Sequence, residues 1–203
     1  MGGTLNTVFG WYRAGYNMAG TQNSAFGWDT PGYFMDGIKN SAFGWYEAGY
    51  SMYGTQNSAI GWSSAGNYMN GTQNTAIWWS GIGGFLSGSQ NTIIWWYTTA
   101  FGMNGILNTV LGWYFAGNYM NGTQNTAIWW SYAGNYMNGV QNTAIWWQYA
   151  GSGMVGTYNT AIGSYATILN SGVQDSIVIG SGALSTQSGA IILGWAGANV
   201  GIG

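Results

Sequence analysis

The hydrophobic and polar positions of this chain repeat with a period of seventeen residues. Each unit opens on Gly-x-x-Asn, continues with Thr or Ser, Ala in most units and a large apolar residue, and ends on Trp preceded by Gly or Trp. The opening glycines are Gly3, Gly20, Gly37, Gly54, Gly71, Gly88, Gly105, Gly122, Gly139 and Gly156, and after one deletion the register resumes at Gly172 and Gly189. A fixed short period predicts a repeat protein, in which each unit is stabilised by stacking on its neighbours.

The unit that begins at Gly122 predicts two strands and two turns. Its residues from Asn125 are rich in β-branched and aromatic types, which favours a strand of about six or seven residues. Ala133-Gly134 then marks a turn, and a shorter strand follows around Asn135 to Asn138. Helix is disfavoured, because a glycine inside each helix would cost about 1 kcal/mol. We therefore expect an all-β fold, a parallel β-solenoid with 17-residue two-strand rungs stacked in a cross-β-like manner.

The repeat divides the chain into two parts. Residues 1–171 form the regular solenoid, whereas residues 172–203 keep the spacing but carry Asp175 where Asn is expected and lose most aromatic residues. We expect the second part to form degenerate terminal rungs or a partial cap. About eleven or twelve rungs at about 4.8 Å each predict a rod on the order of 55 Å long. The motif begins at residue 3, which predicts an exposed first strand edge able to pair with another chain.

Side chains alternate along a strand, so Thr126, Ile128 and Trp130 share one face and Asn125, Ala127 and Trp129 share the other. The first face is bulky in every unit, which favours the interior. Its large apolar column is Phe9, Phe26, Phe43, Ile60, Ile77, Ile94, Leu111, Ile128, Ile145 and Ile162. Its core aromatic column is Trp11, Trp28, Trp45, Trp62, Trp79, Trp96, Trp113, Trp130 and Trp147. From the second strand we expect inward packing by Met18, Met35, Met52, Met69, Met103, Met120, Met137 and Met154.

The residue before the constant tryptophan alternates between Gly and Trp, and the tryptophans at this position are Trp78, Trp95, Trp129 and Trp146. Such a change in size is easier to accommodate outside a rung than inside it. We therefore interpret these four residues as a candidate lateral assembly or ligand face.

An asparagine recurs where the turn enters the first strand. The column is Asn6, Asn23, Asn40, Asn57, Asn74, Asn91, Asn108, Asn125, Asn142 and Asn159. Identical amides stacked about 4.8 Å apart form hydrogen-bonded ladders in cross-β structures, and Asn also satisfies neighbouring backbone groups at turns. We expect both roles together, as a structural ladder.

Charge is nearly absent, at 3 % of 203 residues, while 18 % are aromatic. A surface with so little charge leaves large apolar patches, so we infer that other copies of the chain cover most of it. Disorder is disfavoured because the apolar residues recur in strict register. The charged residues are Arg13, Asp29, Asp36, Lys39, Glu47 and Asp175.

The same composition argues against an enzymatic activity or a metal site. The chain has no Cys, no His and few carboxylates, so we expect no enzyme, no catalytic or metal site and no cofactor. Two basic residues cannot neutralise a nucleic-acid backbone. No apolar stretch approaches the roughly 18 residues of a membrane helix, so we predict no membrane span.

The string Met-x-Gly-x-x-Asn-x-Ala, which occurs at Met18 to Ala25, Met52 to Ala59, Met120 to Ala127 and Met137 to Ala144, resembles the curlin repeat of bacterial functional amyloid. The curlin unit carries Gln where this chain has Met, and its period is longer. The resemblance implies a secreted subunit that polymerises into cell-surface fibres of a biofilm matrix. It also implies that the Asn and Ala columns face inward, opposite to the interpretation drawn from constant bulk.

The C-terminal segments Asn159 to Gly163 and Asp175 to Gly180 resemble the head repeats of trimeric autotransporter adhesins. Both resemblances imply an extracellular or cell-surface location.

The sequence thus favours a structural subunit that assembles head to tail into a homo-polymer with lateral packing. Two alternatives remain open. A tryptophan column can bind carbohydrate through its ring faces. A threonine ladder can order water at an ice surface, and the candidate column is Thr75, Thr92, Thr109, Thr126, Thr143 and Thr160.

Overall fold

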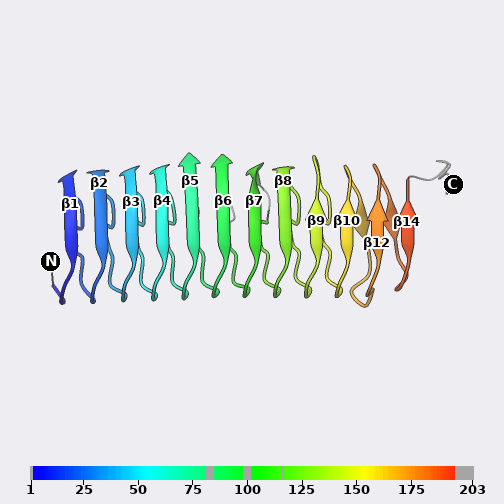
Figure 1. The fold of residues 1–203 in the computed structure, drawn as a ribbon, viewed down its shortest axis with the longest axis horizontal. Helices are drawn as coiled ribbons and strands as arrows, with labels where there is room; N and C mark the ends of the chain where they lie inside the picture. The colour runs from blue at the N-terminus through cyan, green and yellow to red at the C-terminus, as the bar shows by residue number, and fades with distance from the viewer. Residues whose placement is uncertain (1, 81–84, 98–101, 116, 195–203) are drawn as a thin grey trace.

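A computed structural model describes residues 2–80, 85–97, 102–115 and 117–194, with the side chains of Trp78, Ser80, Trp95 and Trp129 left out. The chain is a β-solenoid whose rungs stack into a rod with the two termini at opposite ends (Figure 1). The strands are β1 (Thr7–Tyr12), β2 (Ser24–Asp29), β3 (Ser41–Tyr46), β4 (Ser58–Ser63), β5 (Thr75–Ser80), β6 (Thr92–Tyr97), β7 (Thr109–Tyr114), β8 (Thr126–Ser131), β9 (Thr143–Ile145), β10 (Thr160–Ile162), β11 (Thr167–Ile168), β12 (Ile177–Ile179), β13 (Leu184–Ser185) and β14 (Ile191–Leu193).

The main sheet has twelve parallel strands in sequence order, from β1 to β10 and then β12 and β14. Neighbouring strands pair in register, so that Ala25 lies beside Ala42 and Ile60 beside Ile77. Each of these pairs is separated by the seventeen residues of the sequence period. The parallel β-solenoid predicted from the repeat is therefore confirmed.

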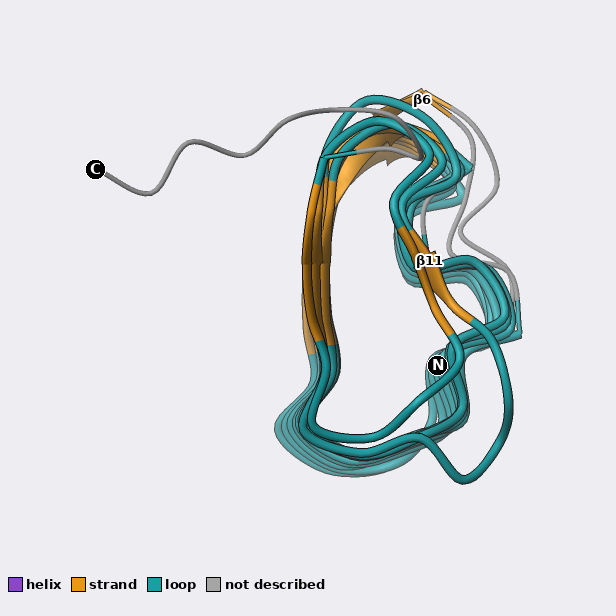
Figure 2. Ribbon diagram, turned by 90° about the vertical axis from the view of Figure 1, so that its right-hand side faces the viewer, coloured by secondary structure: helices purple, strands orange, loops and turns teal. Residues whose placement is uncertain are grey.

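The second strand of each rung is much reduced. Among the described residues it forms strands only in β11 and β13, which make a separate two-stranded sheet, and in other rungs it forms single bridges such as Met35 to Met52. The predicted turn at Ala133-Gly134 is present, but it continues through Tyr136. Because Tyr136 has a φ of 56°, in the left-handed region, it cannot continue an extended strand. Figure 2, which looks along the rod, shows the main sheet on one wall and turns around most of the remainder.

The inward face of the main sheet is the opposite of the one predicted from constant bulk. The Ala, Asn and Met columns are buried, and all eight predicted methionines, from Met18 to Met154, are fully buried. The tryptophan column predicted as core instead lies on the outer surface. Its exposed members, with 41–78 % of each residue accessible, are Trp11, Trp28, Trp45, Trp62, Trp79, Trp96, Trp130 and Trp147, and Trp113 is intermediate.

The rung is too thin to hold large rings. A Cβ placed on Gly66, in the turn facing the sheet, would lie 2.7 Å from the Ala59 Cβ and 2.5 Å from the Met69 Sδ. The walls therefore approach so closely that a small residue on the sheet and an unbranched Met on the opposite wall fill the space. A tryptophan in place of Ala59 has no room, so the bulky alternate positions face outward.

The C-terminal rungs change in two steps. From β9 onward the strands of the main sheet shorten from six to three residues. The next residue has a φ of 127° at Trp146, 132° at Gly163 and 128° at Gly180, which ends the extended segment. The last rung is also shorter, because Ile177 pairs with Ile191, only fourteen positions later.

The C-terminal rungs pair in a different register from the one predicted from the sequence. One residue is lost before Gly172, since Tyr149 stacks on Tyr165, sixteen positions later. It is regained before Val173, which lies beside Gly156, so Thr160 and Ile177 still pair at a separation of seventeen. Three residues are then lost between β13 and β14, because β11 and β13 also keep the seventeen-residue offset. Consequently Ser176, not Asp175, occupies the asparagine position.

Candidate assembly surfaces

The asparagine ladder runs inside the rod and joins each rung to the next. The main-chain N–H of Asn91 donates to the Asn74 Oδ1 at 3.0 Å, and the Asn74 Nδ2 donates to the Gly88 carbonyl at 2.7 Å. The same pair of bonds recurs between successive rungs from Asn23 to Asn142. A direct amide-to-amide bond is made from Asn91 Nδ2 to Asn74 Oδ1 at 3.1 Å. The predicted ladder is therefore a side-chain-to-backbone ladder, which combines the two expected roles.

Ser176 ends this ladder with a shorter side chain. Its main-chain N–H donates to the Asn159 Oδ1 at 3.0 Å. Its hydroxyl donates to the Gln187 carbonyl at 2.7 Å and accepts from the Ala190 N–H at 3.3 Å. These bonds copy the donor and acceptor roles of Asn, and each partner lies three positions earlier because the rung is three residues shorter. The shorter rung thus matches the shorter reach of Ser.

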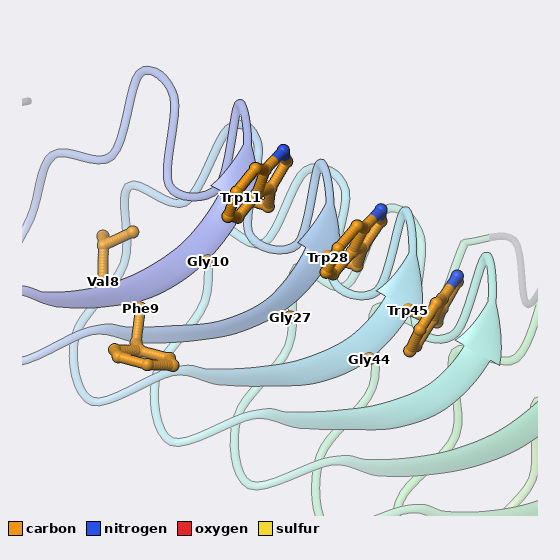
Figure 3. A pocket seen from close by; sticks show the side chains of 8 residues that line it. All are labelled: Val8, Phe9, Gly10, Trp11, Gly27, Trp28, Gly44 and Trp45. Atoms are coloured by element: carbon orange, nitrogen blue, oxygen red, sulfur yellow. The ribbon is translucent and has the colours of Figure 1, made fainter.

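The outer face of the main sheet carries a ridge of stacked indoles, which we call the Trp ridge. It consists of the nine-residue column Trp11, Trp28, Trp45, Trp62, Trp79, Trp96, Trp113, Trp130 and Trp147. Successive rings lie 4.8–5.7 Å apart, with interplanar angles of 2–16°. In Figure 3 the first three rings stand parallel, with their nitrogen atoms at the outer tips. The ridge therefore presents ring edges, while each internal ring has both faces covered by its neighbours.

A second ridge runs two positions earlier along each strand. This apolar ridge is the column Phe9, Phe26, Phe43, Ile60, Ile77, Ile94, Leu111, Ile128, Ile145 and Ile162. Its rings also stack, with the centroids of Phe26 and Phe43 4.9 Å apart and their planes at 1°. The two ridges are about 7 Å apart, since each residue advances a strand by about 3.3 Å.

Between the two ridges lies a groove. The residue at its floor is glycine in β1 to β4 and in β7, and tryptophan in the other rungs up to β9. Its first section has a volume of about 500 Å³ and is lined by Val8, Phe9, Gly10, Trp11, Gly27, Trp28, Gly44 and Trp45 (Figure 3). A second section of about 350 Å³ shares Gly44 and Trp45 with the first and continues to Ile77 and Trp79. A further section of about 330 Å³ lies between Leu111 and Trp147. The groove therefore follows the rod axis across several rungs.

The candidate lateral face predicted at Trp78, Trp95, Trp129 and Trp146 is described for Trp146 alone, since the side chains of the other three lie outside the described residues. Trp146 is 47 % exposed. By strand alternation it belongs to the inward face with Ala144, but its φ of 127° breaks the alternation. It lines a hollow of about 300 Å³ with Ile162, Gly163 and Ile179 on the outer surface.

The surface offers different features to the two binding alternatives, which are ice binding by threonines and carbohydrate binding by tryptophans. The threonine column from Thr75 to Thr160 is half-buried and lies on the outward face beside the apolar ridge. A sugar ring stacks on an aromatic face, but the faces of the internal indoles are covered by each other. Trp11, at the end of the ridge, is 78 % exposed and offers the one open outer face at the N-terminal end of the column.

The N-terminal end of the rod exposes the edge of β1. Thr7 donates its N–H to the Asn23 carbonyl in the next rung, so the alternate residues Val8 and Gly10 direct their main-chain polar groups toward the open end. The Asn6 Nδ2 bonds to the Gly2 and Ala19 carbonyls. The end therefore combines strand-edge groups with the exposed side chains of Phe9 and Trp11.

The described part of the chain contains no group of three or more acidic, Cys or His residues placed to hold a metal ion. Within that same part, no helix has the length and apolar character needed to span a membrane. No protein-family model matches the chain, and no curated protein or solved structure matches it either.

Proposed function

We propose that this protein is a structural subunit that assembles into an extracellular fibre or surface layer, in the manner of functional amyloid. The observation that carries the proposal is the outer surface. The Trp ridge, which runs from the β1 rung to the β9 rung, and the apolar ridge, which runs from β1 to β10, carry no charged residue, and the chain has only six charged residues among 203. Exposed apolar patches on monomeric proteins rarely exceed a few hundred Å². A surface of this kind is stable in water when other molecules cover it.

The N-terminal edge supports growth along the rod axis. Strand edges with unpaired main-chain groups are templates for another strand, and the groups of Val8 and Gly10 face that end. The C-terminal end offers a less regular partner, because Ala190 stands at the asparagine position and has no side-chain acceptor. Head-to-tail contact would leave the Asn6 N–H without the Oδ1 that its counterparts bind. We therefore propose axial growth that is weaker at each junction between copies than within a rod.

The extracellular location and the matrix or adhesive role rest on the curlin and adhesin resemblances of the repeat. The buried Asn and Ala columns agree with the inward face that the curlin resemblance implies. Adhesion and scaffolding both require a fibre, so the existence of the fibre is the first property to test.

Cryo-electron microscopy of the purified protein at neutral pH, without denaturant, tests the proposal. We expect fibres or sheets with an axial repeat of about 4.8 Å. The variant Asn74→Asp/Asn91→Asp/Asn125→Asp should abolish them, since stacked carboxylates cannot donate to the glycine carbonyls. The control Asn138→Asp changes an exposed residue whose side-chain Oδ1 accepts a hydrogen bond from the Asn121 N–H, a role that a carboxylate keeps, and should leave fibre yield unchanged.

Discrete rods at every protein concentration would contradict the proposal. Measurements of thermal hysteresis and of glycan binding would then test the half-buried threonine column and the exposed Trp11 as ligand surfaces.

A further inference from the structure

We infer that two copies of this chain pack side by side and parallel, with the Trp ridge of each copy in the groove of the other. This inference rests on the proposed self-assembly and names the surface and orientation that assembly uses. It concerns the outer face of the main sheet, from β1 through β9, and not the ends of the rod.

The first argument is the area of the face. A strand of six residues is about 20 Å wide, and nine rungs extend about 43 Å, so the face measures about 860 Å². Two such faces in contact would bury about 1,700 Å², which lies within the range of about 1,200–2,000 Å² of stable protein interfaces. A small ligand or a single extended peptide would cover only part of this surface.

The second argument is the match of repeat and chemistry. The ridge positions of β1 to β9 carry Phe, Ile, Leu and Trp without a charged residue, and the groove floor is glycine in β1 to β4, where its first two sections lie. The Trp ridge repeats every 4.8–5.7 Å. A partner that contacts every rung must have the same repeat and an apolar surface, and a second copy has both. Identical faces of stacked strands interdigitate in this way in steric zippers.

The third argument fixes the orientation. Two identical faces in contact are related by a two-fold axis that lies in the interface. If that axis crosses the rods, the copies are antiparallel, and each ridge lies directly over the same ridge of the partner. If the axis runs along the rods, the copies are parallel and the lateral order of ridges is reversed. A sideways shift of one copy by about 3.3 Å, which is half the distance between the two ridges, then places each Trp ridge in the partner's groove.

Single cysteines test the orientation, because the chain has none of its own. In the parallel pair the Trp45 positions of the two copies face each other at the same rung, and so do the Trp130 positions. Because packed sheets lie about 10 Å apart, beyond the reach of a direct disulfide, a bis-maleimide linker of about that length serves as the cross-linker. We expect Trp45→Cys and Trp130→Cys each to form cross-linked dimers, at least tenfold more than Tyr53→Cys. Tyr53 is equally exposed but lies on the opposite side of the rung, among Tyr68, Asn70 and Phe85.

Antiparallel packing would give the opposite result. A mixture of Trp45→Cys and Trp113→Cys, the third positions from the two ends of the Trp ridge, would then form mixed dimers. Trp45→Cys, Trp113→Cys or Trp130→Cys alone would not be cross-linked under the same treatment. That result would overturn the parallel arrangement, as would equal cross-linking of the Tyr53→Cys control.

A charge pair tests the face itself without removing a tryptophan. Ile60→Glu/Ile77→Glu places two carboxylates on the exposed apolar ridge, and Gln56→Glu/Gln73→Glu adds the same charge at an exposed corner. We expect sedimentation velocity to show at least a tenfold weaker self-association for the ridge variant alone. Circular dichroism checks that both variants keep the strand content of the wild type.

The outcomes separate this inference from the proposed function. Unchanged fibres in the ridge variant would overturn the paired face but leave self-assembly intact. Dimers of the wild type that never grow into fibres would support the paired face and contradict the fibre. A wild type that stays monomeric at every concentration would overturn both.

Discussion

The rungs from β1 to β8 and the rungs from β9 onward share a register but differ in regularity. The first group has six-residue strands, an unbroken asparagine ladder and the stacked Trp ridge. The second group has three-residue strands, and its ladder passes from Asn159 to Ser176. Parallel pairing continues through both groups, so backbone hydrogen bonds alone do not require long strands. The strand shortens at β9 although Asn142, Ile145 and Trp147 still continue their columns. The rung itself loses three residues only after Ser176 replaces Asn in the ladder. The difference teaches that strand length and rung length change independently.

The largest expected effect comes from breaking the ladder in the regular group. Asn91→Asp removes the amide donor to the Gly105 carbonyl, which lies 2.8 Å away, and buries a carboxylate at a fully buried position. We expect a loss of at least about 3 kcal/mol in the free energy of unfolding, since a buried charge without a donor is costly. Thermal and denaturant unfolding measure the change. An effect equal to that of the exposed control Asn138→Asp would contradict the ladder as a source of stability.

The second prediction compares crowding in the two groups. Gly66 and Gly182 have φ values of 63° and 68°, so alanine is strained at both. A Cβ at Gly66 meets the Met69 Sδ at 2.5 Å, whereas a Cβ at Gly182 meets no atom within 4 Å. We expect Gly66→Ala to cost about 2–4 kcal/mol, from left-handed strain and overpacking. Gly182→Ala should cost about 1–2 kcal/mol, from strain alone.

Denaturant unfolding of both alanine variants measures this difference. Equal destabilisation would show that the thin interior does not limit side-chain size.

The third prediction concerns the end of the ladder. Ser176→Ala removes the hydroxyl that bonds the Gln187 carbonyl and the Ala190 N–H, so we expect a loss of about 1–2 kcal/mol. The effect should be local, because the rungs before Asn159 keep their own bonds. Hydrogen exchange should accelerate in β12 and β14 and remain unchanged in β3 to β6. Uniform acceleration across the rod would instead indicate one cooperative unit.

The smallest expected effect is on pH dependence and lies in the regular group. Desolvation, with the neighbouring Tyr33 and Tyr68, raises the pKa of Tyr50 above its usual value. Because the pKa of Tyr50 is higher in the folded state than in the unfolded state, protonated Tyr50 favours folding. This contribution to stability is complete below the unfolded pKa of about 10 and is lost as the pH rises through the folded pKa. We expect a flat melting temperature near neutral pH and a decline in strongly alkaline solution. Tyr50→Phe should reduce that decline, and an identical decline would contradict the assignment.

Sequence pattern predicted a large part of this architecture. The period identified the parallel register, the glycine turns and the buried methionines from Met18 to Met154. It also identified the asparagine ladder, because a polar residue in strict register with a turn glycine needs partners in the next rung. At the C-terminus the prediction placed Asp175 at the asparagine position, because Asp resembles Asn and the strand pairing was not known. Ser176 was missed because a hydroxyl reproduces the bonds of Asn only where the rung is shorter.

The sequence by itself therefore determined the period, the stacking and the two faces of each strand, because these follow from local alternation and repetition. Only the tertiary structure decided which face is inside. The Trp and apolar columns are constant from rung to rung, and stacked rings outside a rod require the same constancy as packed residues within it. The distance between the walls separates the two possibilities, and at Gly66 that distance leaves room for Ala59 and Met69 but not for an indole. This distance is set by the left-handed corners acting together, so strand alternation in one unit does not reveal it.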